Sequence, residues 1–83
     1  QGREQLKTSQ FTAALQSWQQ ALLIYREIKD RQGQGKALGN IGLAYHYLGD
    51  YRKAIEYYQQ SLPILREIKD SKTEGIVLYN FGN

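Results

Sequence analysis

The sequence predicts an all-α fold in which hairpins of antiparallel helices stack into a solenoid. The first observation is an internal repeat, because residues 10–42 align without a gap to residues 50–82 and match at 14 of 33 positions. The second is the spacing of apolar residues, which recur at steps of three and four, as on one face of a helix. No segment alternates apolar and polar residues as a strand would. Fixed-period similarity of this kind marks an array of one supersecondary unit.

The expected elements follow one another along the 40-residue period. We expect half of a first helix at 1–8, a second helix at 11–30, a first helix at 34–48, a second helix at 51–70 and half of a first helix at 74–83. Gly49 and Asp50 separate the middle pair, because glycine closes a helix in the left-handed conformation and aspartate caps the next one. Pro63 lies inside a helix whose apolar pattern continues to Ile68, so we expect a kink there and no break.

Small residues at matching positions predict close packing within a helix pair. Gly42 and Ala44 on the first helix, with Ala54 and Ser61 on the second, would let the two backbones approach. The large aromatic residues Trp18 and Tyr58 occupy matching positions one period apart. We expect these two side chains to fill the space between successive pairs, because aromatic anchors at helical spacing are usually core.

Composition places the chain among globular domains. It has 83 residues, of which 41% are hydrophobic and 23% charged, enough for one small domain. No apolar run approaches the ~20 residues of a membrane span, and no signal peptide pattern opens the chain. We therefore expect no membrane partner and a cytoplasmic location. The chain starts in mid-pattern without Met, so we expect a segment of a longer protein.

Charge and side-chain chemistry argue against a nucleic-acid binder and against an enzyme. The net charge of +3 is small, and basic and acidic residues are interleaved, without a one-sided basic stripe. Cysteine is absent and His46 is the sole histidine, so no metal-ligand spacing exists and we expect no cofactor. The glycines of Gly33-Gln34-Gly35 lack the lysine-hydroxyl pair of a phosphate loop and are interpreted as a turn.

The stretch from Leu38 to Leu62 resembles the tetratricopeptide repeat almost position by position. The resemblance rests on Leu38, Asn40-Ile41-Gly42, Tyr45, the turn Gly49-Asp50-Tyr51, and the positions of Ala54, Tyr58 and Ser61. The neighbouring copies keep Gly2, Phe11, Ala14, Trp18 and Ala21 before it, and Leu78, Asn80, Phe81 and Gly82 after it. The resemblance implies a right-handed superhelix of helical hairpins that binds proteins or peptides in a concave groove.

Two features depart from the usual pattern of this family. The period is 40 residues here, against about 34 in most members. The proline that often closes the second helix is absent, and Pro63 lies earlier. A long second helix that ends in Arg-Glu-Ile-Lys-Asp is similar to the 40-residue subclass found in Partner-of-Inscuteable-type scaffolds and close to kinesin light chains.

The resemblance implies that first helices line the groove. The expected peptide-binding residues are Lys36, Asn40, Leu43 and Tyr47 in the complete first helix, Tyr79 and Asn80 in the next, and Arg3 and Lys7 in the N-terminal one. Neighbouring positions expected on the same face are Leu6, Gly39, His46, Ile76 and Asn83. Basic residues among them would favour acidic peptides.

Asn40 and Asn80 support this expectation by their own chemistry, with one alternative left open. An asparagine side chain carries both a donor and an acceptor, so two of them one period apart could clamp an extended backbone. In the alternative, each asparagine only bonds locally within its own helix turn.

Two functions remain as alternatives at this stage. The first is a protein-interaction module, and the second is a structural spacer or self-assembling unit with no ligand of its own. Self-association is expected in either case, because the last expected helix ends in apolar residues and is half of an unpaired hairpin. We expect end-to-end dimers or stacks, or dimers that exchange helices.

Overall fold

The fold is a row of four α-helices joined by three-residue turns. The computed structural model describes residues 2–81, with side chains from residue 8 onward. The helices are α1 (Gly2–Glu27), α2 (Arg31–Tyr47), α3 (Tyr51–Glu67) and α4 (Ser71–Phe81), and no strand occurs among the described residues. The predicted all-α repeat architecture is confirmed.

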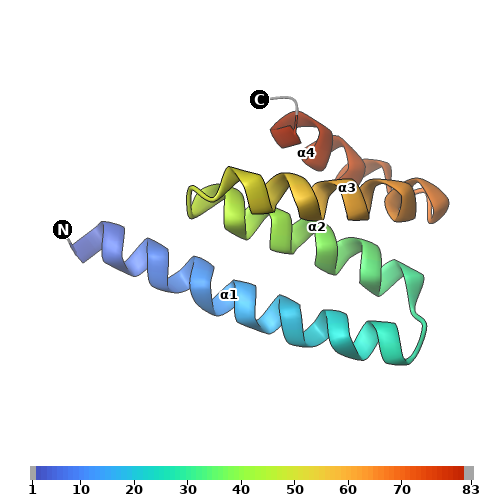
Figure 1. The fold of residues 1–83 in the computed structure, drawn as a ribbon, viewed down its shortest axis with the longest axis horizontal. Coiled ribbons are helices and arrows are strands. Elements are labelled where there is room, and N and C mark those ends of the chain that lie inside the picture. Colours follow the sequence, from blue (N-terminus) through green and yellow to red (C-terminus); the bar gives the residue numbers. More distant parts are fainter. Residues whose placement is uncertain (1, 82–83) are drawn as a thin grey trace.

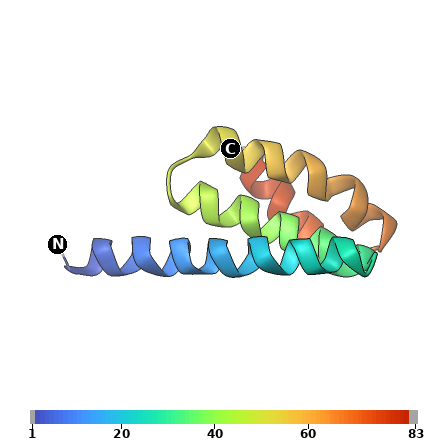
Figure 2. The same ribbon diagram turned by 60° about the horizontal axis from the view of Figure 1, so that its bottom comes forward.

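Each helix packs antiparallel against the next, and α4 also touches α2. Figure 1 shows α2 between α1 and α3, with α4 on the far side of α3 from α1. In Figure 2 the N-terminal part of α1 projects beyond the other helices. The described part measures 42 × 28 × 20 Å, the elongated shape of stacked hairpins.

The three turns share one geometry, which explains where the helices end. Lys29, Gly49 and Lys69 all adopt positive φ, at 59°, 88° and 59°. The residue that follows each of them donates its backbone N–H to a carbonyl five residues earlier, at 2.9 Å in all three turns. This is the hydrogen bond with which a left-handed residue closes a helix. The 40-residue repeat therefore extends to the backbone of the turns at Lys29 and Lys69, and the turn between them has the same form.

Aspartate side chains start the next helix at each turn. Asp30 accepts a hydrogen bond from the backbone N–H of Gly33 (3.1 Å), and Asp50 from that of Lys53 (3.3 Å). Asp70 accepts from the backbone N–H of Thr73 at 3.1 Å and from its hydroxyl at 2.8 Å. Because these aspartates are caps, the second helices end at 27 and 67, three residues before the expected 30 and 70. The next helices begin at 31 and 71, three residues before the expected 34 and 74, so Gly33-Gln34-Gly35 lies within α2 and is not the expected turn.

The expected break between residues 8 and 11 is also wrong. We expected a half helix at 1–8 and a separate helix at 11–30, but α1 runs unbroken from Gly2 to Glu27. The turn residues Gly49 and Asp50 have Ser9 and Gln10 as their equivalents one period earlier. Serine lacks the freedom of glycine at positive φ, and glutamine is a poor cap, so nothing in the local sequence ends the helix there.

The core lies between the helices in two clusters. Leu15, Leu22, Leu38 and Ile41 belong to the cluster between α1 and α2, which Ile64 of α3 also joins. The other cluster, between α3 and α4, contains Ala54, Tyr58, Leu65 and Val77, each no more than 1% exposed. The helices thus bury their faces pairwise, as in a solenoid.

The predicted close approach of the middle pair is confirmed. A Cβ placed on Gly42 would lie 2.6 Å from two ring carbons of Tyr58, so the ring lies directly against the α2 backbone. Ala54 and Ser61 are buried beside it, and the Ser61 hydroxyl donates to the carbonyl of Tyr58 at 2.9 Å. Pro63 is exposed, and α3 continues through it.

Candidate protein-interaction surface

The expected binding residues of α2 form one stripe along the helix. Lys36, Asn40, Leu43 and Tyr47 are separated by four, three and four residues, which places them on the same side. Lys36 and Tyr47 are exposed, while Asn40 and Leu43 are half-buried. The stripe is therefore accessible along its length.

The corresponding residues of α4 are also accessible. Tyr79 is 74% exposed and Ile76 is 42% exposed, while Asn80 is half-buried. Because α4 contacts α2, two first-helix segments lie next to each other in the structure. We refer to Lys36, Asn40, Leu43 and Tyr47 of α2 with Ile76, Tyr79 and Asn80 of α4 as the first-helix face.

The N-terminal residues expected at this surface have a different setting. Arg3 and Lys7 were expected in a separate first helix, but their backbone belongs to the continuous helix α1. The side chains of Arg3, Leu6 and Lys7, and the whole of Asn83, lie outside the described residues. The first-helix face is therefore defined by α2 and α4.

The two asparagines make identical local hydrogen bonds. Nδ2 of Asn40 donates to the carbonyl of Lys36 at 2.8 Å, and Nδ2 of Asn80 donates to the carbonyl of Ile76 at 2.9 Å. Local bonding, the alternative left open by the sequence, therefore occurs in this structure. Each local bond uses one of the two amide hydrogens. The other hydrogen and the Oδ1 acceptor remain for a ligand, and the local bond holds the amide in one orientation.

The apolar part of the face is partly engaged within the molecule. The Tyr47 ring stacks on Phe11 of α1, with centroids 5.0 Å apart and an interplanar angle of 15°. Leu43 packs against the core cluster between α3 and α4. Tyr47 nevertheless remains 59% exposed, so part of its ring is accessible while the stacking holds the ring in place.

Two carboxylates, those of Asp70 and Glu74, accompany the positive charges near the face. The backbone and side-chain hydrogen bonds from Thr73, with smaller effects of the Lys36 and Lys72 charges, hold the pKa of Asp70 below its ordinary value. Glu74 forms an ion pair with Arg66, whose Nε lies 2.8 Å from the carboxylate. Lys36 therefore has a carboxylate, that of Asp70, close enough to interact with its charge.

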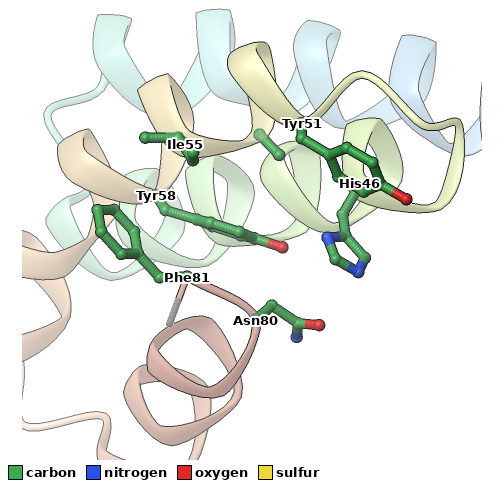
Figure 3. Close-up of a pocket in the computed structure, with 7 residues that line it drawn as sticks. His46, Tyr51, Ile55, Tyr58, Asn80 and Phe81 are labelled. Carbon is green, nitrogen blue, oxygen red and sulfur yellow. The ribbon is translucent and has the colours of Figure 1, made fainter. Parts of the chain in front are cut away.

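A hollow of about 210 Å³ opens beside the first-helix face, between α2, α3 and α4. Its lining residues are His46, Tyr51, Ala54, Ile55, Tyr58, Asn80 and Phe81. Figure 3 shows the Tyr58 ring crossing the hollow, with its hydroxyl directed to the side where His46 and Asn80 lie. The walls are mainly apolar, and the polar groups gather at one side.

The Tyr58 hydroxyl has an unusual environment. It is buried and makes no hydrogen bond within the described structure. Burial, with a smaller effect of Tyr47, raises the pKa of Tyr58 to about 12. The group therefore stays protonated and can donate to an acceptor that enters the hollow.

The hollow was not expected from the sequence. Tyr58 was expected only as core, and Tyr51 and Ile55 only as apolar positions of a helix. Leu15 and Ile55 are equivalent apolar residues, so the alignment of the two copies carries no signal for the hollow. In the structure Ile55 is 40% exposed, whereas Leu15, which packs in the core cluster with residues of α2, is 9% exposed.

A model of the tetratricopeptide repeat family matches residues 5–67. The chain belongs to the tetratricopeptide repeat family. Members of this family generally mediate protein–protein interactions and are generally not catalytic. A search of curated proteins finds no match to the chain.

Three further observations concern a membrane span, a metal site and the sole histidine. Within residues 2–81, no helix combines the length and the apolarity that crossing a bilayer requires. The described side chains also contain no group of three or more histidine, cysteine, aspartate or glutamate residues placed to hold a metal ion. His46 makes edge-on ring contacts with Tyr47 and Tyr51, at centroid distances of 5.6 and 5.2 Å.

Proposed function

We propose that this tetratricopeptide repeat segment binds an extended peptide of a partner protein along the first-helix face. The observation that carries the proposal is the pair Asn40 and Asn80. The two amides lie one period apart on helices that touch, with the same local hydrogen bond and the same free donor and acceptor. Amides held in this way suit the alternating N–H and C=O groups of an extended backbone.

The hollow supports the proposal as a place for one side chain of the peptide. Asn80 belongs both to the first-helix face and to the lining of the hollow. A peptide held by Asn80 would therefore have a mainly apolar cavity beside it. The buried hydroxyl of Tyr58 would donate a hydrogen bond to an acceptor on the incoming side chain, which favours a ligand that is apolar with one polar tip.

The charge of the face does not require an acidic partner. The sequence favoured acidic peptides through Arg3, Lys7 and Lys36. In the structure Asp70 lies near Lys36 and offsets its charge. We propose a protein or peptide partner of mixed character, and neither a nucleic acid nor a membrane.

The 40-residue period supports a finer assignment. We infer that the chain belongs with the subclass similar to Partner-of-Inscuteable-type scaffolds and kinesin light chains. The support is the period itself, with the segment Arg-Glu-Ile-Lys-Asp and its positive-φ lysine repeated at the end of both second helices. A scaffold that holds peptide segments would be in keeping with that group.

A peptide library selected on the immobilised chain, followed by calorimetry, tests the proposal. Asn40→Ala and Asn80→Ala should each weaken the selected peptide about fivefold to thirtyfold, which corresponds to about 1–2 kcal/mol per lost hydrogen-bonding amide. Gln60→Ala is the matched control, because the Gln60 amide also donates to the carbonyl four residues earlier but lies on α3. Equal effects of all three substitutions, or none, would remove the first-helix face as the binding site.

A further inference from the structure

The two ends of the row expose side chains whose equivalents are buried in its middle. Ile24 on α1 is 57% exposed, whereas Ile64, its equivalent on α3, is 8% exposed. Leu78 on α4 is 43% exposed, whereas Leu38, its equivalent on α2, is 3% exposed. The buried pair, Leu38 and Ile64, belongs to one core cluster. The exposed pair lies at opposite ends of the molecule. Leu78 on α4 lacks a helix with an isoleucine like Ile64 against it, and Ile24 on α1 lacks a helix with a leucine like Leu38.

The α2–α3 hairpin shows how such a pair fits together. Gly35 of α2 faces Ile64 of α3 so closely that a Cβ on the glycine would lie 2.8 Å from the Ile64 Cγ2. Gly75, the equivalent of Gly35 on α4, has nothing within 4 Å of that position. The α4 surface therefore keeps open the place that an isoleucine fills in the hairpin, and α1 carries an exposed isoleucine at the matching position.

We propose that this chain assembles head to tail, with α1 of a second copy packed on the outer face of α4. The geometry is that of the α2–α3 hairpin without a connecting turn. Ile24 of the second copy would cover Gly75, and Leu78 would be buried against the same helix. The contact continues an interface already present, because α4 is anchored on the inner side through Val77, which is fully buried.

This arrangement differs from a two-fold dimer. The two surfaces that meet are different, so each bound copy still has one free surface of each kind. Assembly therefore proceeds to open chains as concentration rises. A two-fold dimer through the α4 face alone would stop at two copies and would leave Ile24 exposed.

Substitutions that block one end at a time separate these arrangements. Ile24→Glu blocks the α1 end, and Leu78→Glu blocks the α4 end; both side chains are exposed, so the fold should remain. Leu23→Glu is the matched control on α1, because its equivalent Pro63 stays exposed in the α2–α3 hairpin. Ile76→Glu is the control on α4, because its equivalent Lys36 also stays exposed.

Sedimentation velocity over a wide range of concentration provides the measurement, with circular dichroism to confirm that each variant is folded. The unmodified chain should show a mass that increases with concentration beyond the dimer. Each blocked variant alone should associate at least tenfold more weakly, because an isoleucine or leucine no longer becomes buried. The two control variants should associate like the unmodified chain.

Mixing the two blocked variants gives the decisive result. Ile24→Glu keeps a free α4 end and Leu78→Glu keeps a free α1 end, so the mixture should form a one-to-one dimer that grows no further. A mixture that stays monomeric, an Ile24→Glu variant that still dimerises alone, or an unmodified chain that is monomeric at every concentration would each overturn the proposal. Peptide binding by the Ile24→Glu variant should be normal, which keeps this test separate from that of the first-helix face.

Discussion

The close contact between Gly42 and Tyr58 leads to a prediction of opposite signs for one substitution at two glycines. A Cβ at position 42 would lie 2.6 Å from two Tyr58 ring carbons and 3.3 Å from the carbonyl oxygen of Ala54. Replacing a helical glycine by alanine contributes about 1 kcal/mol through helix propensity. Overpacking of a filled core costs about 1–3 kcal/mol. Gly42→Ala should therefore destabilise the chain by up to about 2 kcal/mol.

Gly75→Ala is the matched substitution, because Gly75 also lies within a helix but has nothing within 4 Å of its Cβ position. Only the propensity gain remains, so this variant should be about 0.5–1 kcal/mol more stable. Urea unfolding followed by circular dichroism at low protein concentration measures both changes. In thermal unfolding, each kcal/mol should shift Tm by about 4–8 °C. The reasoning is refuted if Gly42→Ala stabilises the chain as much as Gly75→Ala does.

Three further predictions follow from the cap, the buried hydroxyl and the continuous first helix. Asp70→Ala should cost about 1 kcal/mol at neutral pH by urea unfolding, because the hydrogen bonds from Thr73 are lost. Since the folded pKa of Asp70 lies below its ordinary 3.8, this difference should shrink as the pH falls below that value; a constant difference would contradict the cap. Tyr58→Phe should raise stability by about 1 kcal/mol, since it removes a buried unpartnered hydroxyl. The unmodified chain should also lose stability between pH 10.0 and about 12, because only its unfolded state ionises Tyr58 there. Tyr58→Phe should lose less stability over that range, and an equal loss of stability in both chains would argue against the burial of the hydroxyl. Ser9→Gly combined with Gln10→Asp should end α1 at that point, and the helical carbon chemical shifts around residue 9 should be lost. An unchanged helix would show that the local sequence is not the reason for its continuity.

The sequence predicted the fold best where residues needed for close helix packing recur every 40 residues. The small residues Gly42, Ala54 and Ser61 predicted the close helix pair, because only small side chains allow that approach, and the structure has it. Helix ends were harder to place. Lys29 and Lys69 adopt a left-handed conformation that lysine does not favour, so their sequence suggested three more helical residues. The aspartate caps that follow, together with the packing of the next helix, outweigh that preference.

The candidate site was predictable only in part, for a similar reason. Asn40 and Asn80 could be placed on matching faces from the period alone. The local bonds that orient their amides follow from helix geometry and were left as one of two alternatives. The hollow depends on which part of α3 the helix α4 leaves uncovered, and on the direction of the Tyr58 hydroxyl. Neither follows from the identity of the residues, because both are set by tertiary packing.

The side-chain amide resonances of asparagine and glutamine test most directly whether α2 and α4 present a common binding face. A selected peptide would be added to the isotope-labelled chain, and two-dimensional NMR spectra would follow the Nδ2 and Nε2 hydrogens. We expect the amides of Asn40 and Asn80 to shift together at the same peptide concentration, while that of Gln60 on α3 stays in place. Movement of Gln60 with Asn40 and Asn80 unchanged would contradict the account.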